Sequence, residues 1–205
     1  MLEIQGDTYY FSPETGAMQT GWITLDGTSR YFDTETGVMT NIGHAEVQLD
    51  VPDYKQFGES WSDTKIQYST IGKVGCLVTC LSMKYSAETK VTTPDKMLSK
   101  LSFSGDNLLW SSCTDLGYQV DTLSGSLTQA MMQKIYNQLQ NGKSVILGGK
   151  KANGGQHYVV ITGYTGSTGT SFSASNFVIN DPGSSYRFRL DEFAALFPTM
   201  YKMIY

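Results

Sequence analysis

The sequence predicts an α+β fold, with helices packed on an antiparallel sheet, preceded by a small all-β region of hairpin repeats. Helix-like patterns come before strand-like patterns between residues 51 and 205, an order typical of α+β domains. The first 43 residues instead repeat a short aromatic motif. The chain has 205 residues, of which 40% are hydrophobic and 17% charged, as expected for a folded protein with a sizeable core.

Two copies of the aromatic motif lie 21 residues apart. Gly6–Phe11 (GDTYYF) is matched by Gly27–Phe32 (GTSRYF), and Thr15–Met18 (TGAM) by Thr36–Met39 (TGVM). Aromatic runs between Gly, Asp and Thr predict β-hairpins with tight turns. A unit this short cannot bury its aromatic face alone, so each copy needs neighbours on which to stack. We therefore expect a repeat region over residues 1–43 that belongs to a longer array in a parent protein.

These repeats resemble the cell-wall-, glucan- and choline-binding repeats of Gram-positive surface proteins, in which Gly-x-x-Tyr-Tyr-Phe precedes Gly-x-Met-x-x-Gly-Trp. Gly16–Trp22 (GAMQTGW) fits the second half of that pattern. The resemblance implies aromatic cages that bind choline, glucan or cell-wall polysaccharide through stacking and cation–π attraction. The candidate ligand-binding residues are Tyr10, Trp22 and Tyr31. The alternative is a spacer that has kept only the aromatic residues needed for packing.

The rest of the chain is predicted to be a polar connector, residues 44–50, followed by one domain over residues 51–205. The apolar spacing of Cys76–Tyr85 predicts a helix. Thr93-Pro94-Asp95 predicts the start of a second helix, because Thr is a capping residue and Pro is favoured at the first helical position. A third helix is predicted over Leu127–Leu139, before an Asn-Gly stop.

Four strands are predicted after these helices: Ser144–Leu147, His157–Tyr164, Phe177–Asn180 and Tyr186–Leu190. Gly and Ser fill the turn at 166–173. The second and third of these strands are expected to pair as an antiparallel hairpin, which would bring the start of one beside the end of the other.

Composition excludes several classes of partner. The chain has a formal net charge of −4 and no basic run, so nucleic acid is not expected to bind. No stretch approaches the roughly 18 apolar residues that span a membrane. Met1–Gly6 lacks the features of a signal peptide, so we expect an export signal upstream in the parent protein. No metal and no cofactor are expected, because Asn141–Ser144 lacks the first Gly of a phosphate loop and one Cys-x-x-x-Cys pair makes no zinc site.

Three cysteines are too few for a disulfide framework. Cys76 follows Gly75 at the start of a predicted helix, where unpaired N–H groups and the helix dipole stabilise a thiolate. This placement suits a nucleophile, and the alternative is a tight turn followed by a core thiol. Cys80 lies one helical turn further and is interpreted as core packing. Cys113 receives no role.

A thiol nucleophile needs an imidazole base, and the chain has two histidines. His44 lies in the connector and is interpreted as a solvated residue. His157 begins a predicted strand after a Gly-rich loop, where site residues gather, and is the plausible base for Cys76. Asp181, or alternatively Asn180, ends the neighbouring strand and would orient the imidazole. Asn-Asp-Pro-Gly is also an ordinary turn sequence, which leaves a purely structural alternative.

Four motifs occur together in one order along the domain: Val51–Gln56 (VPDYKQ), Gly75–Met83 (GCLVTCLSM), His157–Tyr164 (HYVVITGY) and Ile179–Pro182 (INDP). With these motifs, residues 49–205 resemble the peptidase family that trims double-glycine leaders from bacteriocins, and its stand-alone bacterial relatives. The resemblance implies a papain-like cysteine peptidase fold.

By the same resemblance, Cys76 is the nucleophile, His157 the base and Asp181 the orienting acid. Gln56 would hold the oxyanion together with the backbone N–H of Cys76. The transporter-linked relatives have Asp-Cys-Gly where this chain has Gly75-Cys76-Leu77, and Gln56 lies further ahead of the cysteine than in those relatives. Both departures weaken the case for a double-glycine leader as substrate.

Together the motifs predict an extracellular, cell-wall-associated cysteine hydrolase, a peptidase or amidase. Its expected substrate is a peptidoglycan peptide or a surface protein, and the repeats would target it to wall polysaccharide, glucan or choline. The alternative is a non-catalytic surface module that keeps the peptidase fold and only binds. The sequence does not separate a peptidase from an amidase or a transacylase.

Overall fold

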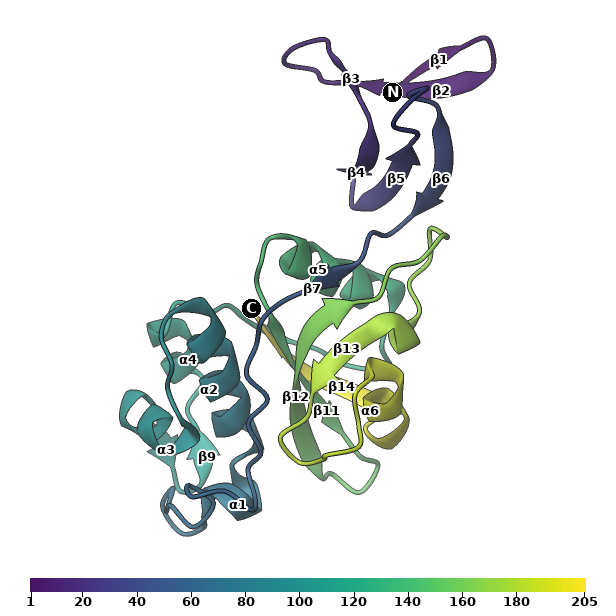
Figure 1. Cartoon of the computed structure of the whole chain (residues 1–205). Coiled ribbons are helices and arrows are strands. Elements are labelled where there is room, and N and C mark those ends of the chain that lie inside the picture. Colours follow the sequence, from purple (N-terminus) through teal and green to yellow (C-terminus); the bar gives the residue numbers. More distant parts are fainter.

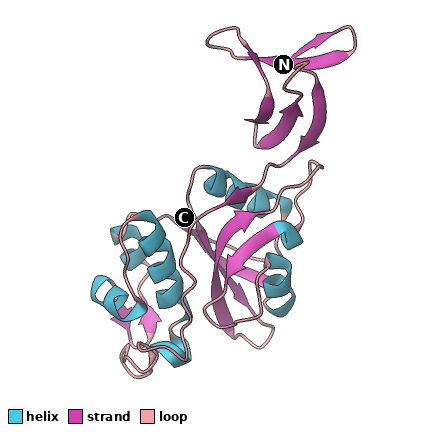
Figure 2. Cartoon of the chain, in the orientation of Figure 1, coloured by secondary structure: helices cyan, strands magenta, loops and turns pink.

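The computed structural model describes residues 1–205, and the side chains of all of them except Asn41 and Ile42. Figure 1 shows a narrow N-terminal arm of hairpins above a larger body, in which helices lie on both sides of a sheet. In Figure 2 the arm consists of strands and loops, and the helices drawn belong to the body.

Each repeat in the arm contains the predicted β-hairpin, and a third antiparallel strand extends the hairpin to a three-stranded sheet. The first tight turn has positive φ at Gln5 and Gly6, 55° and 92°, and the second has positive φ at Asp26 and Gly27, 53° and 74°. Turns of this kind match the twist of the flanking strands. The strands are β1 (Leu2–Ile4), β2 (Asp7–Phe11), β3 (Met18–Gln19), β4 (Gly21–Leu25), β5 (Thr28–Phe32) and β6 (Met39–Gly43).

The second repeat is fixed to the body through helix α5 (Gln129–Gln140). The side-chain amide of Gln133 donates to the carbonyl oxygen of Gly27 at 2.8 Å. The hydroxyl oxygens of Ser29 and Tyr136 lie 3.1 Å apart, and both residues are fully buried. Polar groups at such a depth need partners, and these two satisfy each other across the junction.

The segment between the two parts is buried where His44 lies. Its side chain was interpreted above as solvated, and that interpretation is wrong, because the residue is 1% exposed. The imidazole packs on Phe172 with ring centroids 3.8 Å apart, and its Nδ1 lies 3.3 Å from Ser167 Oγ. Strand β7 (Val47–Gln48) then pairs with β12 (Gln156–Tyr164), so the segment also contributes to the main sheet.

The main sheet of the body is antiparallel throughout, in the order β10-β14-β11-β12-β13 with β7 beside β12. Its strands are β10 (Val120–Thr122), β11 (Val145–Lys150), β12, β13 (Phe177–Asn180) and β14 (Thr199–Ile204), and a separate hairpin consists of β8 (Phe103–Ser104) and β9 (Asn107–Leu108). The helices are α1 (Ile71–Val74), α2 (Cys76–Glu88), α3 (Pro94–Met97), α4 (Ser111–Asp115), α5 and α6 (Leu190–Leu196), with 3₁₀ turns at Leu98–Lys100 and Ala174–Asn176.

Two hydrophobic clusters form the core, one on each face of this sheet. Along β11, Val145 and Leu147 pack with α5 and α6, whereas Ile146 between them packs with α2. This alternation is the two-residue period of a strand that is buried on both faces. Each fully buried aliphatic side chain contributes about 1.5–3 kcal/mol to folding. The arrangement of helices on an antiparallel sheet confirms the predicted fold class.

The prediction of a strand over Tyr186–Leu190 is wrong. The segment makes one isolated bridge, between Arg189 and Val178, and then becomes helix α6 at Leu190. The carboxylate of Glu192 accepts the backbone N–H groups of Phe188, at 2.9 Å, and of Arg189, at 3.1 Å. A glutamate at the third helical position that satisfies these donors is a capping signal, and it ends any extended run there.

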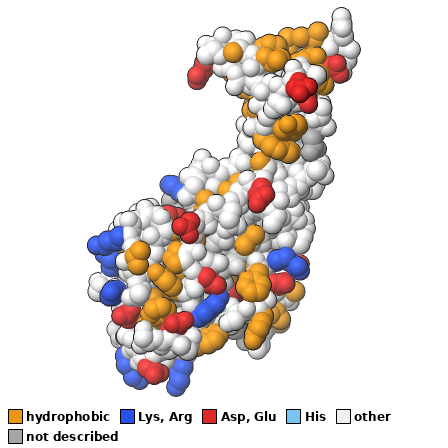
Figure 3. Space-filling model, in the orientation of Figure 1, with side chains coloured by type: hydrophobic (Ala, Val, Ile, Leu, Met, Phe, Trp, Pro, Cys, Tyr) orange, Lys and Arg blue, Asp and Glu red, His pale blue; other side chains and the backbone are white. Residues whose placement is uncertain are grey.

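The described residues contain no helix of the length and apolarity that crossing a bilayer requires. On the face seen in Figure 3, acidic and basic side chains are interspersed over the body, and orange hydrophobic side chains gather on the arm. Several of these apolar arm residues are well exposed, namely Leu2, Ile4, Met18 and Trp22. The arm therefore presents apolar surface that its own two sheets do not bury.

Candidate active site

Cys76 is the first residue of α2 and is partly exposed in a cleft. Helix α1 ends at Val74, and Gly75 joins the two helices. A Cβ at Gly75 would lie 2.7 Å from the Cα of Ile71, so glycine is required at this junction. The thiol is thereby placed at the N-terminal end of a 13-residue helix, where backbone N–H groups and the dipole favour a thiolate.

His157 and Asp181 are brought together by neighbouring strands. Antiparallel pairing of Val160 with Asn180 sets the start of β12 beside the residue that follows β13. The Nε2 atom of His157 lies 2.6 Å from Oδ1 of Asp181. A Cβ at Gly183 would lie 3.0 Å from that nitrogen, so the ring packs directly against the backbone. Because Asp181 occupies Nε2, Nδ1 is the ring nitrogen available to the thiol.

The carboxylate of Asp181 is fully buried and held on every side. Its Oδ1 accepts the backbone N–H of Gly183 at 2.7 Å, and Arg187 forms an ion pair with Oδ2. The Lys55 ammonium donates to the Asp181 carbonyl oxygen at 2.9 Å. Burial by itself raises the pKa of the Asp181 carboxyl, but the hydrogen bond and charge of His157, the Gly183 N–H and the Arg187 charge outweigh burial and lower the pKa. Sequence patterns gave no signal for Arg187, which lies in an irregular loop.

The electrostatics of His157 follow from the same contacts. Burial alone would lower its pKa, but hydrogen bonds and charge interactions with Asp181 and Cys76 raise the pKa of His157 to about 9. The imidazole is therefore a cation at neutral pH.

Gln56 reaches the cleft from the segment before α1 and is 8% exposed. Its backbone N–H donates to the carbonyl oxygen of Pro182 at 2.9 Å, which fixes it beside the loop that carries Asp181. Its side-chain Nε2 donates one hydrogen to the Gly72 carbonyl at 3.1 Å. The second amide hydrogen is left for a ligand, as an oxyanion donor requires.

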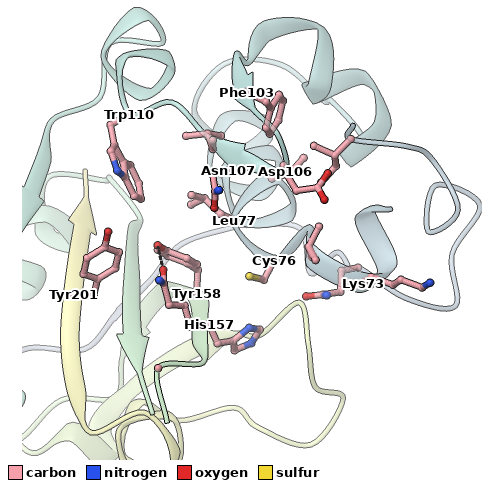
Figure 4. A pocket seen from close by; sticks show the side chains of 17 residues that line it. Lys73, Cys76, Leu77, Phe103, Asp106, Asn107, Trp110, His157, Tyr158 and Tyr201 are labelled. Atoms are coloured by element: carbon pink, nitrogen blue, oxygen red, sulfur yellow. Dashed lines mark hydrogen bonds between the residues drawn. The ribbon is translucent and has the colours of Figure 1, made fainter. Parts of the chain in front are cut away.

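The cleft has a volume of about 630 Å³ and is lined by the first turn of α2 and by the start of β12. Figure 4 shows Cys76 and Leu77 on one wall, with His157 and Tyr158 on the other. The structure thus brings Cys76, His157 and Gln56 to one cavity, with Asp181 behind His157. Sequence reasoning missed the aromatic lining residues Trp110, Tyr158 and Tyr201. These three residues lie far apart in the sequence, so no sequence motif groups them.

The other two thiols are buried in the core, as predicted for Cys80. Burial raises the pKa of Cys80 well above the ordinary thiol range, and it raises the pKa of Cys113 to about 12. Among the described residues, no three His, Cys, Asp or Glu side chains lie close enough to hold a metal ion.

In the arm, the structure brings two of the three predicted ligand-binding residues together. Trp22 on β4 and Tyr31 on β5 face each other across the hairpin, with ring centroids 5.5 Å apart. Tyr10 belongs to the first sheet and packs against Phe32 of the second at 6.1 Å. Tyr10 therefore joins the two repeats, whereas Trp22 keeps 45% of its surface exposed.

Thiol, imidazole and carboxylate in this order, on helices packed against an antiparallel sheet, define a papain-like domain. The chain belongs to the Peptidase C39-like family, whose model matches residues 48–204. Residues 2–41 match the choline-binding repeat. No curated protein matches the chain. The family assignment supports cysteine peptidase activity for the body and cell-surface choline binding for the arm.

Proposed function

We propose that this chain is a cysteine peptidase or amidase acting at a bacterial cell surface, with Cys76, His157, Asp181 and Gln56 as its catalytic set. The observation that carries the proposal is the 2.6 Å bond from His157 to Asp181, which leaves the other ring nitrogen for the thiol in an open cleft. An imidazole held in one orientation can shuttle a proton between sulfur, leaving group and water.

In the proposed reaction the Cys76 thiolate attacks the carbonyl carbon of an amide. The oxyanion accepts hydrogen bonds from the Gln56 side chain and from the backbone N–H of Cys76. His157 gives its proton to the leaving amine as the C–N bond breaks, which produces a thioester. Water then attacks the thioester while His157 takes its proton, so a carboxylic acid and the free thiol are released.

The proposed substrate is a peptide of the cell wall or of a surface protein, reached through the arm. Trp22 and Tyr31 would bind choline, glucan or wall polysaccharide, because two facing aromatic rings attract a quaternary ammonium or stack on a sugar. The arm is fixed to the body at the buried Ser29–Tyr136 contact. An enzyme bound to the wall through such an arm would present its active-site cleft to wall peptides in a fixed orientation.

Alkylation kinetics test the enzyme proposal. Iodoacetamide is expected to label Cys76 at about pH 6 much faster than it labels glutathione, because an open cleft, a helix N-terminus and a neighbouring histidine are the surroundings of a reactive thiol. Labelled peptides identified by mass spectrometry, at pH values from about 5 to 9, give the rate for each cysteine. Buried Cys80 and Cys113 serve as internal controls. If Cys76 reacts only as glutathione does, the non-catalytic binding module is the correct alternative.

The arm proposal has its own test. Trp22→Ala is expected to weaken retention on a choline-bearing resin by about tenfold, since one cation–π contact contributes roughly 1–2 kcal/mol. Tyr186→Ala is the matched control, because Tyr186 is 88% exposed on the body and removes a comparable aromatic surface. If Trp22→Ala is retained on the resin as well as Tyr186→Ala is, the arm is a spacer and not a choline-binding element.

A further inference from the structure

The end of the cleft beyond His157 is built from three aromatic residues on different elements. Tyr158 follows His157 on β12, Tyr201 lies on β14, and Trp110 directly precedes α4. The ring of Trp110 lies 6.4 Å from that of Tyr158 and 6.3 Å from that of Tyr201, between centroids. Figure 4 shows the three side chains grouped at one end of the cavity, with Cys76 and Lys73 towards the other.

Two backbone features place these rings. The register between β11 and β14 shifts so that Gly148 pairs with Lys202 and Gly149 with Met200, which leaves Tyr201 without an opposite residue. A β-bulge of this kind re-aims a side chain and is common beside active sites. At Gly148, a Cβ would lie 2.6 Å from Tyr158 Cδ1, so the absence of a side chain there makes room for the tyrosine ring.

Two lysines lie against the aromatic rings at this end, although neither is itself among the residues that line the cleft. The Lys150 ammonium lies 3.6 Å from the centroid of the Tyr201 ring. The Lys202 ammonium lies 4.8 Å from the Trp110 ring and 5.4 Å from the Tyr201 ring. Lys202 is only 9% exposed, and its hydrogen-bond partner is the neutral hydroxyl of Thr122 at 2.7 Å.

These positive charges have no acidic partner among the described side chains. The ion pairs of the body engage other lysines, such as Lys84 with Glu88 and Lys134 with Asp121. Asp106 also lines the cleft, but its carboxylate accepts three backbone N–H groups of the loop that holds it. The Lys150 ammonium, which lies over the Tyr201 ring, therefore has no carboxylate partner among the described residues and is free to pair with an anionic ligand.

We propose that the Trp110–Tyr158–Tyr201 end of the cleft is a specificity subsite for a carboxylate-bearing part of the substrate. The subsite rests on the proposed function, and it selects acidic peptides among the possible amide substrates. The carboxylate would accept hydrogen bonds from the Lys150 ammonium and the Tyr201 hydroxyl, while the rings cover the aliphatic part of the same residue. Because Tyr158 directly follows His157 in the chain, the subsite would hold the carboxylate of the substrate beside the scissile bond.

Three small electrophiles test the subsite by their rate of reaction with Cys76. N-bromoacetyl-glutamine amide is neutral, N-bromoacetyl-glutamate amide carries a side-chain carboxylate, and N-bromoacetyl-glutamine carries a terminal carboxylate. One or both acidic probes are expected to react about tenfold faster than the neutral probe, because a hydrogen bond to a charged group contributes that much. The faster of the two identifies whether a side-chain or a terminal carboxylate is preferred.

The matched variants are Lys150→Gln and Lys151→Gln. Both remove one positive charge, but Lys151 lies over Phe197, outside the aromatic group of the subsite. Lys150→Gln is expected to reduce the preference to about twofold, and Lys151→Gln to leave it within about twofold of its original value. The preference should also fall as salt is added, because charge interactions are screened.

Equal rates for all three probes, a faster neutral probe, or the same loss in both lysine variants would overturn the subsite. Each of these outcomes is a ratio between the rates of an acidic and the neutral probe, so it can be measured even if Cys76 reacts slowly with all of them. A rate for every probe no higher than with glutathione would instead contradict the proposed function. The two inferences therefore fail in different ways.

Discussion

Cys76→Ala is expected to abolish hydrolysis of wall peptides while leaving the fold intact. Without the sulfur atom no thioester can form, and loss of a nucleophile of this kind costs about 10⁶-fold in rate. The side chain is partly exposed at the helix N-terminus, so the free energy of unfolding should change by about 1 kcal/mol or less. Peptide release measured by mass spectrometry, with circular dichroism on the same sample, checks both statements.

Cys80→Ala is the matched control, because Cys80 lies on the next turn of α2 and is fully buried. It removes a thiol from the same helix and leaves a small cavity, at a cost of about 1 kcal/mol in stability. Hydrolysis should continue at a rate close to that of the unchanged protein. Activity that survives Cys76→Ala, or that disappears with Cys80→Ala, would contradict the assignment of the nucleophile.

Much of the site could be predicted because its signals are local. The Gly75-Cys76 step marks a helix start, and α2 is then buried at every position from Leu77 to Lys84, so its apolar content alone indicates a core helix. His157 and Asp181 lie at the ends of two strands that follow each other, so antiparallel pairing alone predicts that they approach. The hairpin repeats are equally local, because positive-φ residues and aromatic runs recur within each unit.

The features that could not be predicted depend on contacts between distant segments. His44 is buried because Phe172 and Tyr164, which are far from it in sequence, pack against its ring. Arg187 reaches Asp181 from a loop with no regular pattern. Tyr201 enters the cleft because a bulge shifts the register of β14, and nothing in the sequence of β14 specifies where a bulge will form.

Asp181→Asn is expected to reduce the rate of hydrolysis by about 10³- to 10⁴-fold. The amide cannot stabilise the imidazolium, and it leaves the Arg187 guanidinium without its anionic partner. The pKa of His157 should then fall from about 9 towards its ordinary value of about 6.5, because its main charged partner is gone. Rates of hydrolysis and of Cys76 alkylation, both measured against pH, give the size of the change.

Asn180→Ala separates this effect from a general disturbance of the loop. The Asn180 amide donates to the carbonyl oxygens of Val51 and Pro52, at 3.1 Å and 3.3 Å, and its side chain does not bond to His157. We expect this variant to lose stability but to keep the pH dependence of the unchanged protein. If instead Asn180→Ala shifts the pH profile and Asp181→Asn does not, the orienting residue is Asn180.

The same pair predicts how stability depends on pH. The folded-state pKa of His157 is raised, so its contribution is fully present below about pH 6.5 and is lost as pH rises through about 9. The folded-state pKa of Asp181 is lowered, so its contribution is present above about pH 4 and is lost as pH falls below that. The free energy of unfolding, measured with urea across this range, should therefore show a plateau between about pH 4 and about pH 6.5. In Asp181→Asn the alkaline loss should begin near the same pH, about 6.5, but end at lower pH and be smaller, because the folded-state pKa of His157 is less raised in the variant. If the alkaline loss of stability is unchanged in the variant, a group other than His157 causes it.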